Sequence, residues 1–177
     1  MHYAVTGGIA SGKTWFCNKL RGHGNEVYSC DEAAKRIIRT DPQVREALKA
    51  LVAGDLYLPD GTLQKRVLAA YLTASPDHAA RVNAIVHPKV ADDYLRWQRA
   101  QTTQHTFMEC ALLFESGFDR LAERSICIYA SEAVRLRRLM RRDGISAEQA
   151  RRWMSLQMPE EEKRRRADIV IYNDKDC

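Results

Sequence analysis

The residues with the clearest chemical potential lie near the start of the chain, in the run GGIASGKT at residues 7–14. This run matches G-x-x-x-x-G-K-[ST] at every fixed position, which is the pattern of a loop that wraps phosphate groups. Lys13 can bridge the β- and γ-phosphates of ATP, and Thr14 can place its hydroxyl on Mg²⁺ as a metal ligand. Because glycine lets a backbone approach an oxygen closely, we expect nucleotide contacts from Gly8, Ile9, Ala10, Ser11, Gly12, Lys13 and Thr14.

The alternative is a glycine turn followed by Lys and Thr by chance, and the context disfavours it. Residues 2–6 read as a short buried strand. A helix follows Gly12, with Trp15, Phe16 and Leu20 expected on its apolar side. A GTPase normally needs an N-K-x-D sequence, and residues 173–176 (NDKD) resemble it only superficially.

Further strands are predicted at residues 25–29, 105–109, 125–129 and 168–172, with helices between them. Alternation of strands and helices indicates a mainly parallel sheet covered on both faces. We therefore predict a three-layer α/β P-loop kinase fold with a parallel five-stranded sheet.

From residue 41 to about 100 the sequence is helical, which indicates an insertion between two groups of strands. One helix starts at Asp41-Pro42, a turn is predicted at residues 58–61, and Ser75 caps another helix. His87-Pro88 predicts a break or a new start. A long basic helical stretch after residue 129 is interrupted at residues 143–144, and Ser146 and Gln149 have capping-box spacing.

The composition fits a single globular domain of 177 residues with 45% hydrophobic residues. The net charge of +5 suits an anionic partner, either a nucleotide or a nucleic acid. Five widely spaced cysteines predict buried thiols and neither a disulfide framework nor a zinc site. The sequence shows no long apolar run and no signal peptide, so we expect a cytoplasmic protein without membrane contact.

Beyond the loop, the chain resembles the dephospho-coenzyme A kinases from Tyr3 to Asn173. The shared elements are GGIASGKT, VYSCD at 27–31, LPDG at 58–61, VNAIVHP at 82–88, LLFE at 112–115, RLMxRDG at 138–144, QMP at 157–159 and ADxVIxN at 167–173. The sequence differs from the common pattern at Ala111, often Pro, at Glu109, usually Asp, and at Gln64-Lys65, often Asp-Arg. It also ends soon after Asn173, where the family continues into a final helix, so we expect a shortened C-terminus.

The resemblance implies that Asp31 orients the ribose 3′-hydroxyl of the acceptor or takes its proton. The alternative is a helix N-cap, and both can be true. Arg138 and Arg142 are four residues apart, so a helix puts both on one face, where they can clamp the transferring phosphoryl group. The alternative is a solvated basic face, to which we assign Arg135, Arg137 and Arg141.

Four other residues are candidates. Glu109 ends a strand, at a position suited to a water-mediated Mg²⁺ contact; the alternative is an ordinary strand-end carboxylate. His87, by resemblance, lines the acceptor site, although a packed histidine is the alternative. Gln157 is expected to touch nucleotide when the lid closes, and Asn173 to lie near the adenine unless it is a turn residue.

The resemblance thus implies transfer of phosphate from ATP to dephospho-coenzyme A with Mg²⁺. The nucleotide-binding core is expected at 1–30, 104–133 and 167–177, the helical acceptor domain at 31–103 and the lid at 134–166. We expect a monomer or weak homo-oligomer that binds these small molecules and no nucleic acid. The rival hypotheses are a nucleotide kinase with a different acceptor and a nucleic-acid-binding P-loop protein.

Overall fold

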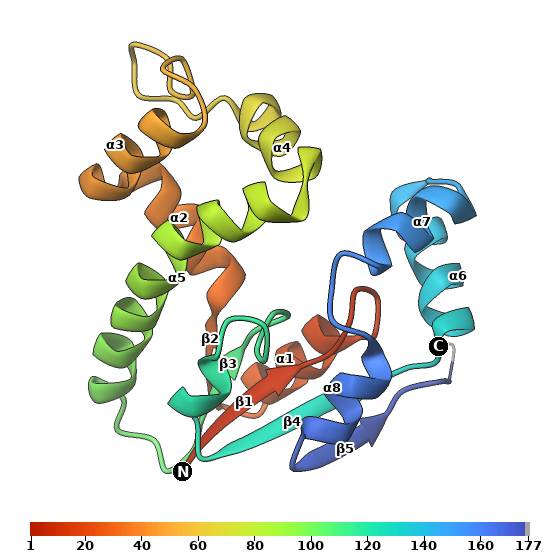
Figure 1. Cartoon of the computed structure of the whole chain (residues 1–177). Helices are drawn as coiled ribbons and strands as arrows, with labels where there is room; N and C mark the ends of the chain where they lie inside the picture. The colour runs from red at the N-terminus through yellow and green to blue at the C-terminus, as the bar shows by residue number, and fades with distance from the viewer. Residues whose placement is uncertain (176–177) are drawn as a thin grey trace. The chain divides into compact units, whose positions relative to one another are not determined.

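Five parallel strands form one sheet in the order β2-β3-β1-β4-β5 (Figure 1). The predicted five-stranded parallel sheet is thereby confirmed. The strands are β1 (His2–Thr6), β2 (Glu26–Ser29), β3 (Thr106–Glu109), β4 (Arg124–Tyr129) and β5 (Ile169–Tyr172).

The structure, a computed structural model, describes residues 1–175. The last two residues of the segment 167–177, including Cys177, lie outside the described residues. The chain divides into two units, one formed by residues 1–29 and 98–177 and the other by residues 30–97. Each unit is described by itself below, under the names sheet unit and helical unit.

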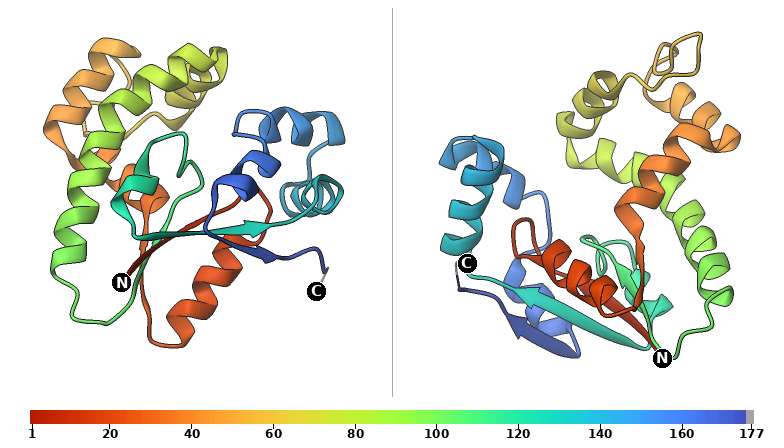
Figure 2. Two further views of the ribbon diagram at one scale, coloured as in Figure 1. Left: turned by 60° about the horizontal axis from the view of Figure 1, so that its bottom comes forward. Right: turned by 180° about the vertical axis from the view of Figure 1, so that it is seen from behind.

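The sheet unit contains helices on both faces of its sheet, with α1 on one face and α8 on the other (Figure 2). Its helices are α1 (Lys13–Gly22), the short 3₁₀ helix η1 (Phe118–Leu121), α6 (Glu132–Asp143), α7 (Ala147–Met154) and α8 (Glu160–Arg166). The predicted cap of α7 is confirmed, because the Ser146 hydroxyl accepts a hydrogen bond from the Gln149 N–H.

The helical unit consists of α2 (Cys30–Thr40), α3 (Pro42–Leu51), α4 (Lys65–Ala74) and most of α5 (Pro76–Arg99). Asp41 caps α3 through its carboxylate, which accepts from the N–H groups of Gln43 and Val44. In the described residues, no helix is both long and apolar enough to span a membrane.

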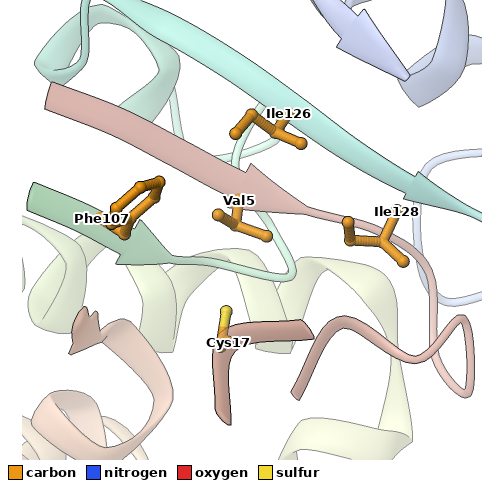
Figure 3. Packing of buried hydrophobic residues seen from close by; sticks show 5 residues of the cluster. All are labelled: Val5, Cys17, Phe107, Ile126 and Ile128. Carbon is orange, nitrogen blue, oxygen red and sulfur yellow. The ribbon is translucent and has the colours of Figure 1, made fainter. Parts of the chain in front are cut away.

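The core of the sheet unit lies between the central strands and α1. Val5, Phe107, Ile126 and Ile128 point from three strands toward Cys17 on α1 (Figure 3). Ala4, Val5 and Thr6 are fully buried, as expected for a central strand of a covered parallel sheet. This packing fixes the direction in which the chain leaves β1.

The carboxyl ends of the strands meet at one edge of the sheet. Val5 and Ser29 both lie beside Glu109 in the strand register, from β1 and β2 respectively. The chain runs to β2 and β3 on one side of β1 and then to β4 and β5 on the other, so the loop after β1 lies at a topological switch point. Such points are where open α/β sheets bind ligands.

Two sequence predictions about the helices were wrong. Helix α5 continues through Pro88, although proline removes one helical hydrogen bond. Its buried side chains Val82, Val86, Val90 and Tyr94 lie on both sides of Pro88, and their packing outweighs the local loss. The apolar side predicted for α1 was wrong only at Trp15, which is half exposed with Lys19 over its ring. Phe16 and Leu20 pack against the core as predicted, beside the fully buried Cys17.

Candidate active site

The phosphate-binding loop, residues 7–14, connects the end of β1 to the start of α1. Gly12 has a φ of 97°, and a Cβ at that position would collide with Nδ2 of Asn173. The Ser11 N–H donates to the Gly8 carbonyl at 3.0 Å, which turns the loop back on itself. Because α1 begins at Lys13, the positive end of its dipole lies at the loop. The local backbone is therefore suited to an anion.

Lys13 and Thr14 share one acceptor, the Oε1 atom of Glu109 at the end of β3. The Lys13 ammonium and the Thr14 hydroxyl each donate to it at 2.9 Å. Arg21 approaches the other carboxylate oxygen at 3.7 Å. The structure thus brings Glu109, which is distant in the sequence, to the adjacent Lys13 and Thr14, and it places a carboxylate beside the loop's cation and hydroxyl.

Glu109 is a largely buried ion-pair partner. Its side chain is 9% exposed, and that of Lys13 is 16% exposed. Burial raises the pKa of Glu109, but Lys13, Thr14 and Arg21 together lower it, and the net pKa lies below its ordinary value. Glu109 is therefore held as an anion at neutral pH.

Asn173 and Arg138 both reach the carbonyl oxygen of Ser11. The Asn173 amide donates to it at 2.8 Å, and Nη1 of Arg138 lies 3.5 Å from it. The other Arg138 nitrogen, Nη2, donates to the Lys175 carbonyl at 2.8 Å. In this structure Asn173 contacts the phosphate-binding loop, and the prediction that it lies near an adenine stays a prediction.

Arg142 does not join Arg138 at the loop. Its guanidinium donates to both carboxylate oxygens of the adjacent Asp143, at 2.7 and 2.8 Å, and its side chain is 59% exposed. The hydrogen bonds from Arg142 lower the pKa of Asp143. The two arginines predicted to share one task thus have different partners.

Sequence reasoning missed two charged residues that lie against the loop. Arg135 was assigned to the solvated face of its helix, which is wrong, because it is buried with Glu160 as its partner. The Glu160 carboxylate accepts from the Gly8 N–H at 2.7 Å. Arg135 precedes the buried Leu139 by four residues and so shares its helix face; that spacing was the available signal.

Gln157 also contacts the loop. Its carbonyl oxygen accepts a hydrogen bond from the Ile9 N–H at 2.9 Å. The predicted contact of Gln157 with nucleotide remains a prediction, but the side chain lies beside one of the amides expected to bind phosphate. Ala10, which follows Ile9 in the loop, has a positive φ of 62°, which is uncommon for a residue with a side chain.

Asp31 and His87 belong to the helical unit. Asp31 lies in the first turn of α2, two residues past the end of β2, and its carboxylate pairs with Lys35 at 2.6 Å. It is 77% exposed and lies inside the helix rather than at its N-cap. His87 is half-buried on α5, and burial lowers its pKa.

The helical unit contains a polar cavity of about 330 Å³ between α2, the start of α3 and α5. Arg36 pairs with Asp93 across it at 2.5 Å, and Lys89 donates to Gln43 at 2.5 Å. The lining residues are Arg36, Ile37, Thr40, Asp41, Pro42, Lys89, Asp92, Asp93 and Arg96. The cavity is therefore lined by both signs of charge.

Comparisons with known proteins agree along the whole chain. Residues 1–177 match the protein family described as dephospho-CoA kinase. A dephospho-CoA kinase of Bacteroides fragilis is 40% identical over 171 residues, covering 96% of this chain and 83% of the relative. That of Chlorobaculum tepidum is 34% identical over 177 residues, covering 96% and 85%.

Solved structures show the same fold. A crystal structure from Thermus thermophilus superimposes with a TM-score of 0.85 at 32% identity, over 99% of this chain and 89% of that one. The dephospho-CoA kinase from Campylobacter jejuni gives a TM-score of 0.72 at 26% identity, with the same coverage.

Proposed function

The chain belongs to the dephospho-CoA kinase family, and from that premise we propose how three parts of the chain divide the reaction. It transfers the terminal phosphate of ATP to the ribose 3′-hydroxyl of dephospho-CoA. The core segments 1–30, 104–133 and 167–177 bind ATP, the helical segment 31–103 binds the acceptor, and segment 134–166 acts as a lid. The contacts of Lys13, Thr14 and Glu109 at the loop carry this proposal.

ATP binds through residues 8–14. The later backbone amides of the loop and the N-terminus of α1 face its phosphates, and Lys13 neutralises charge on the β- and γ-phosphates. In the structure the Lys13 ammonium donates to Glu109. A bound triphosphate offers the Lys13 ammonium a second anionic partner. When ATP binds, Lys13 therefore either leaves the Glu109 carboxylate or contacts both anions. Asn173 and Arg138 support the loop from the Ser11 carbonyl.

The Thr14 hydroxyl and, through water, the Glu109 carboxylate would hold Mg²⁺. These are hard oxygen donors, which fit Mg²⁺, and they lie 2.9 Å apart at the loop. No group of three His, Cys, Asp or Glu side chains suited to a metal occurs in residues 1–175, so phosphate oxygens and water complete such a site. When bound there, the ion shields the phosphate charge and favours attack by the hydroxyl.

The acceptor hydroxyl is oriented by Asp31, which accepts its hydrogen bond or its proton. Asp31 is exposed and follows the last residue of β2, Ser29, by two positions in the sequence. Since Ser29 lies beside Glu109 in the register, the chain enters α2 from the strand end next to the loop's carboxylate. The proposal therefore needs Asp31 to exchange its Lys35 contact for the substrate.

Arg138 and Arg142 stabilise charge on the transferring phosphoryl group when the lid is closed. Arg138 already contacts the loop, whereas Arg142 must leave Asp143 to do so. His87 lines the acceptor site from α5, which belongs largely to the helical unit. Closure excludes water and so limits hydrolysis of ATP.

We further propose that the enzyme works in the cytoplasm, as a monomer or weak homo-oligomer, and that it does not bind nucleic acid. An acceptor screen with purified protein and Mg·ATP tests it. Dephospho-CoA is expected to stimulate ADP release, while AMP, shikimate and nucleosides are not. Saturable activity with AMP alone would contradict the assignment of the acceptor. Tight binding of nonspecific DNA at physiological salt would contradict the absence of nucleic acid.

A further inference from the structure

A buried ion pair contacts the backbone of the phosphate-binding loop. The side chains of Arg135 and Glu160 are 9% and 6% exposed, and Nη1 of Arg135 lies 3.8 Å from Oε2 of Glu160. Burying two charges is costly, and the separation is long for a pair selected for its strength alone. The same Oε2 atom accepts the 2.7 Å hydrogen bond from the Gly8 N–H. The Glu160 carboxylate thus pairs with Arg135 and also accepts a hydrogen bond from the loop backbone.

The loop approaches this pair so closely that only glycine fits. A Cβ added at Gly8 would collide with Oε2 of Glu160 and with Nη1 of Arg135. Because both side chains are buried, they have little room to retreat. Gly8 falls on a variable position of the G-x-x-x-x-G-K-[ST] pattern, so its need for glycine comes from the two side chains that lie over its peptide.

Glu160 is itself held in place from below. Lys163, one turn later on α8, is fully buried and donates to the Ala111 carbonyl at 2.6 Å. It also pairs with Glu115 at 3.1 Å, and Glu115 accepts from the Met158 N–H at 2.9 Å. These contacts tie both the start of α8 and the segment before it to residues 111 and 115, and so they hold the Glu160 carboxylate near Gly8.

Helix α6 reaches the loop at two points. Arg135 acts at Gly8 through Glu160, and Arg138, three residues later, lies 3.5 Å from the Ser11 carbonyl. A spacing of three residues puts both arginines on neighbouring positions of one helix surface. The first half of the loop is therefore held at both ends by α6 and α8.

We propose that Arg135 and Glu160 are positioning residues for ATP: Glu160 fixes the Gly8 peptide, and Arg135 fixes Glu160, so that the later amides face the phosphates. The inference rests on the proposed ATP-binding role of the loop. It differs from direct binding of phosphate by Arg135, because it predicts that any buried acceptor at position 160 restores most of the effect.

Two double variants isolate the hydrogen bond to Gly8. Arg135→Met/Glu160→Leu removes both charges and the acceptor, whereas Arg135→Met/Glu160→Gln removes the charges and keeps an acceptor. A buried N–H without a partner is costly, so the Leu variant should bind ATP about 10-fold more weakly than the Gln variant. Calorimetric titration with Mg·ATP measures this. The KM for dephospho-CoA should be the same in both, because the acceptor is bound elsewhere.

The matched control is Arg165→Met/Glu162→Leu, which removes an exposed ion pair from the same helix. It should bind ATP as the wild type does. Equal ATP affinity in the Leu and Gln variants would overturn the inference. If the wild type itself fails to bind ATP, the proposed function fails instead, so the two failures are distinguishable.

A second measurement uses the unaltered chain, in case the Leu variant fails to fold. Amide hydrogen exchange of ¹⁵N-labelled protein should show the Gly8 N–H protected, because it donates to a buried carboxylate. Arg135→Lys, which keeps the cation, should preserve that protection. Exchange of Gly8 as fast as an exposed amide, in the folded wild type, would refute the proposed contact.

Discussion

The Lys13 ammonium donates a 2.9 Å hydrogen bond to the Oε1 atom of Glu109, across the gap between the loop and the end of β3. The cation of the phosphate-binding motif is therefore held in place by a carboxylate of the sheet. Thr14 shares that oxygen, so both side chains predicted to meet the phosphates and the metal are held by one group. Substitutions at these three positions should have distinct consequences.

Lys13→Ala should fold and lose most of its turnover. The ammonium contributes charge stabilisation in the transition state, and removing one such group costs about 10²- to 10³-fold in kcat. ADP release with dephospho-CoA measures the loss. Lys19→Ala is the control, because Lys19 lies on the same helix over the exposed ring of Trp15. A Lys13→Ala rate equal to that of the wild type would remove the phosphate role.

Thr14→Ala should raise the Mg²⁺ concentration needed for half-maximal rate by about 10-fold, since it removes a predicted oxygen ligand. A Mg²⁺ titration at saturating ATP measures this, and excess chelator should stop the reaction of the wild type. Thr103→Ala, on an exposed segment, serves as the control. An unchanged Mg²⁺ dependence would argue against Thr14 as a ligand.

Glu109 should make stability depend on pH. Its folded-state pKa lies below the ordinary 4.5, with burial opposed by Lys13, Thr14 and Arg21. A lowered pKa means that its stabilising contribution is full above 4.5 and is lost as the pH falls through the folded value. The melting temperature of Glu109→Gln should therefore approach that of the wild type as pH falls from about 6 to about 3.

Thermal unfolding across that range measures the effect. Glu148→Gln, an exposed carboxyl on α7, should follow the wild type at every pH. A constant difference between Glu109→Gln and the wild type would show that ionisation of Glu109 does not stabilise the fold.

Arg138 and Arg142 should differ when replaced by alanine. Arg138→Ala should raise the KM for ATP and lower kcat by about 10- to 100-fold, because it removes both a loop contact and a proposed phosphoryl contact. Arg142→Ala should lower kcat alone. Arg141→Ala, which changes an exposed position of the same helix, is the control. Steady-state kinetics with both substrates separate the effect on the KM for ATP from the effect on kcat. If Arg138→Ala and Arg142→Ala changed both parameters equally, the two arginines would not have the different roles proposed for them.

Asp31→Asn should lower kcat on the order of 10²-fold with little change in the KM for ATP, since it removes the proposed proton acceptor. Stability should hardly change, because the carboxylate is exposed and its pair with Lys35 is solvated. Lys35→Ala tests whether that pair alone matters for the rate. A full rate in Asp31→Asn would exclude its role as base.

The sequence was informative where a local rule decides the outcome. The loop, the cap of α7 by Ser146 and the start of α3 at Asp41 each follow from a few neighbouring residues. Pro88 misled because the buried line of Val82, Val86 and Val90 keeps the helix intact, and that burial is a tertiary effect. Local sequence propensity carries no information on that tertiary burial.

The partners of charged residues were the harder part. Arg135 and Arg137 look alike in a basic run, yet Arg135 is buried because α8 brings Glu160 to its side. Helix periodicity relates Arg135 to Leu139, but no local pattern identifies a carboxylate contributed by another helix. Likewise, the capture of Arg142 by its neighbour Asp143 depends on rotamers rather than on spacing.

Trp15 follows Thr14 directly, and its indole is half exposed, with the Lys19 ammonium 4.1 Å from the ring centroid. An indole next to a charge is sensitive in its emission to any change in local field or hydration. With Trp97 and Trp153 replaced by phenylalanine, Trp15 becomes the single tryptophan of the chain. The first turn of α1 then carries its own optical reporter, through which arrival of a nucleotide can be timed without a label.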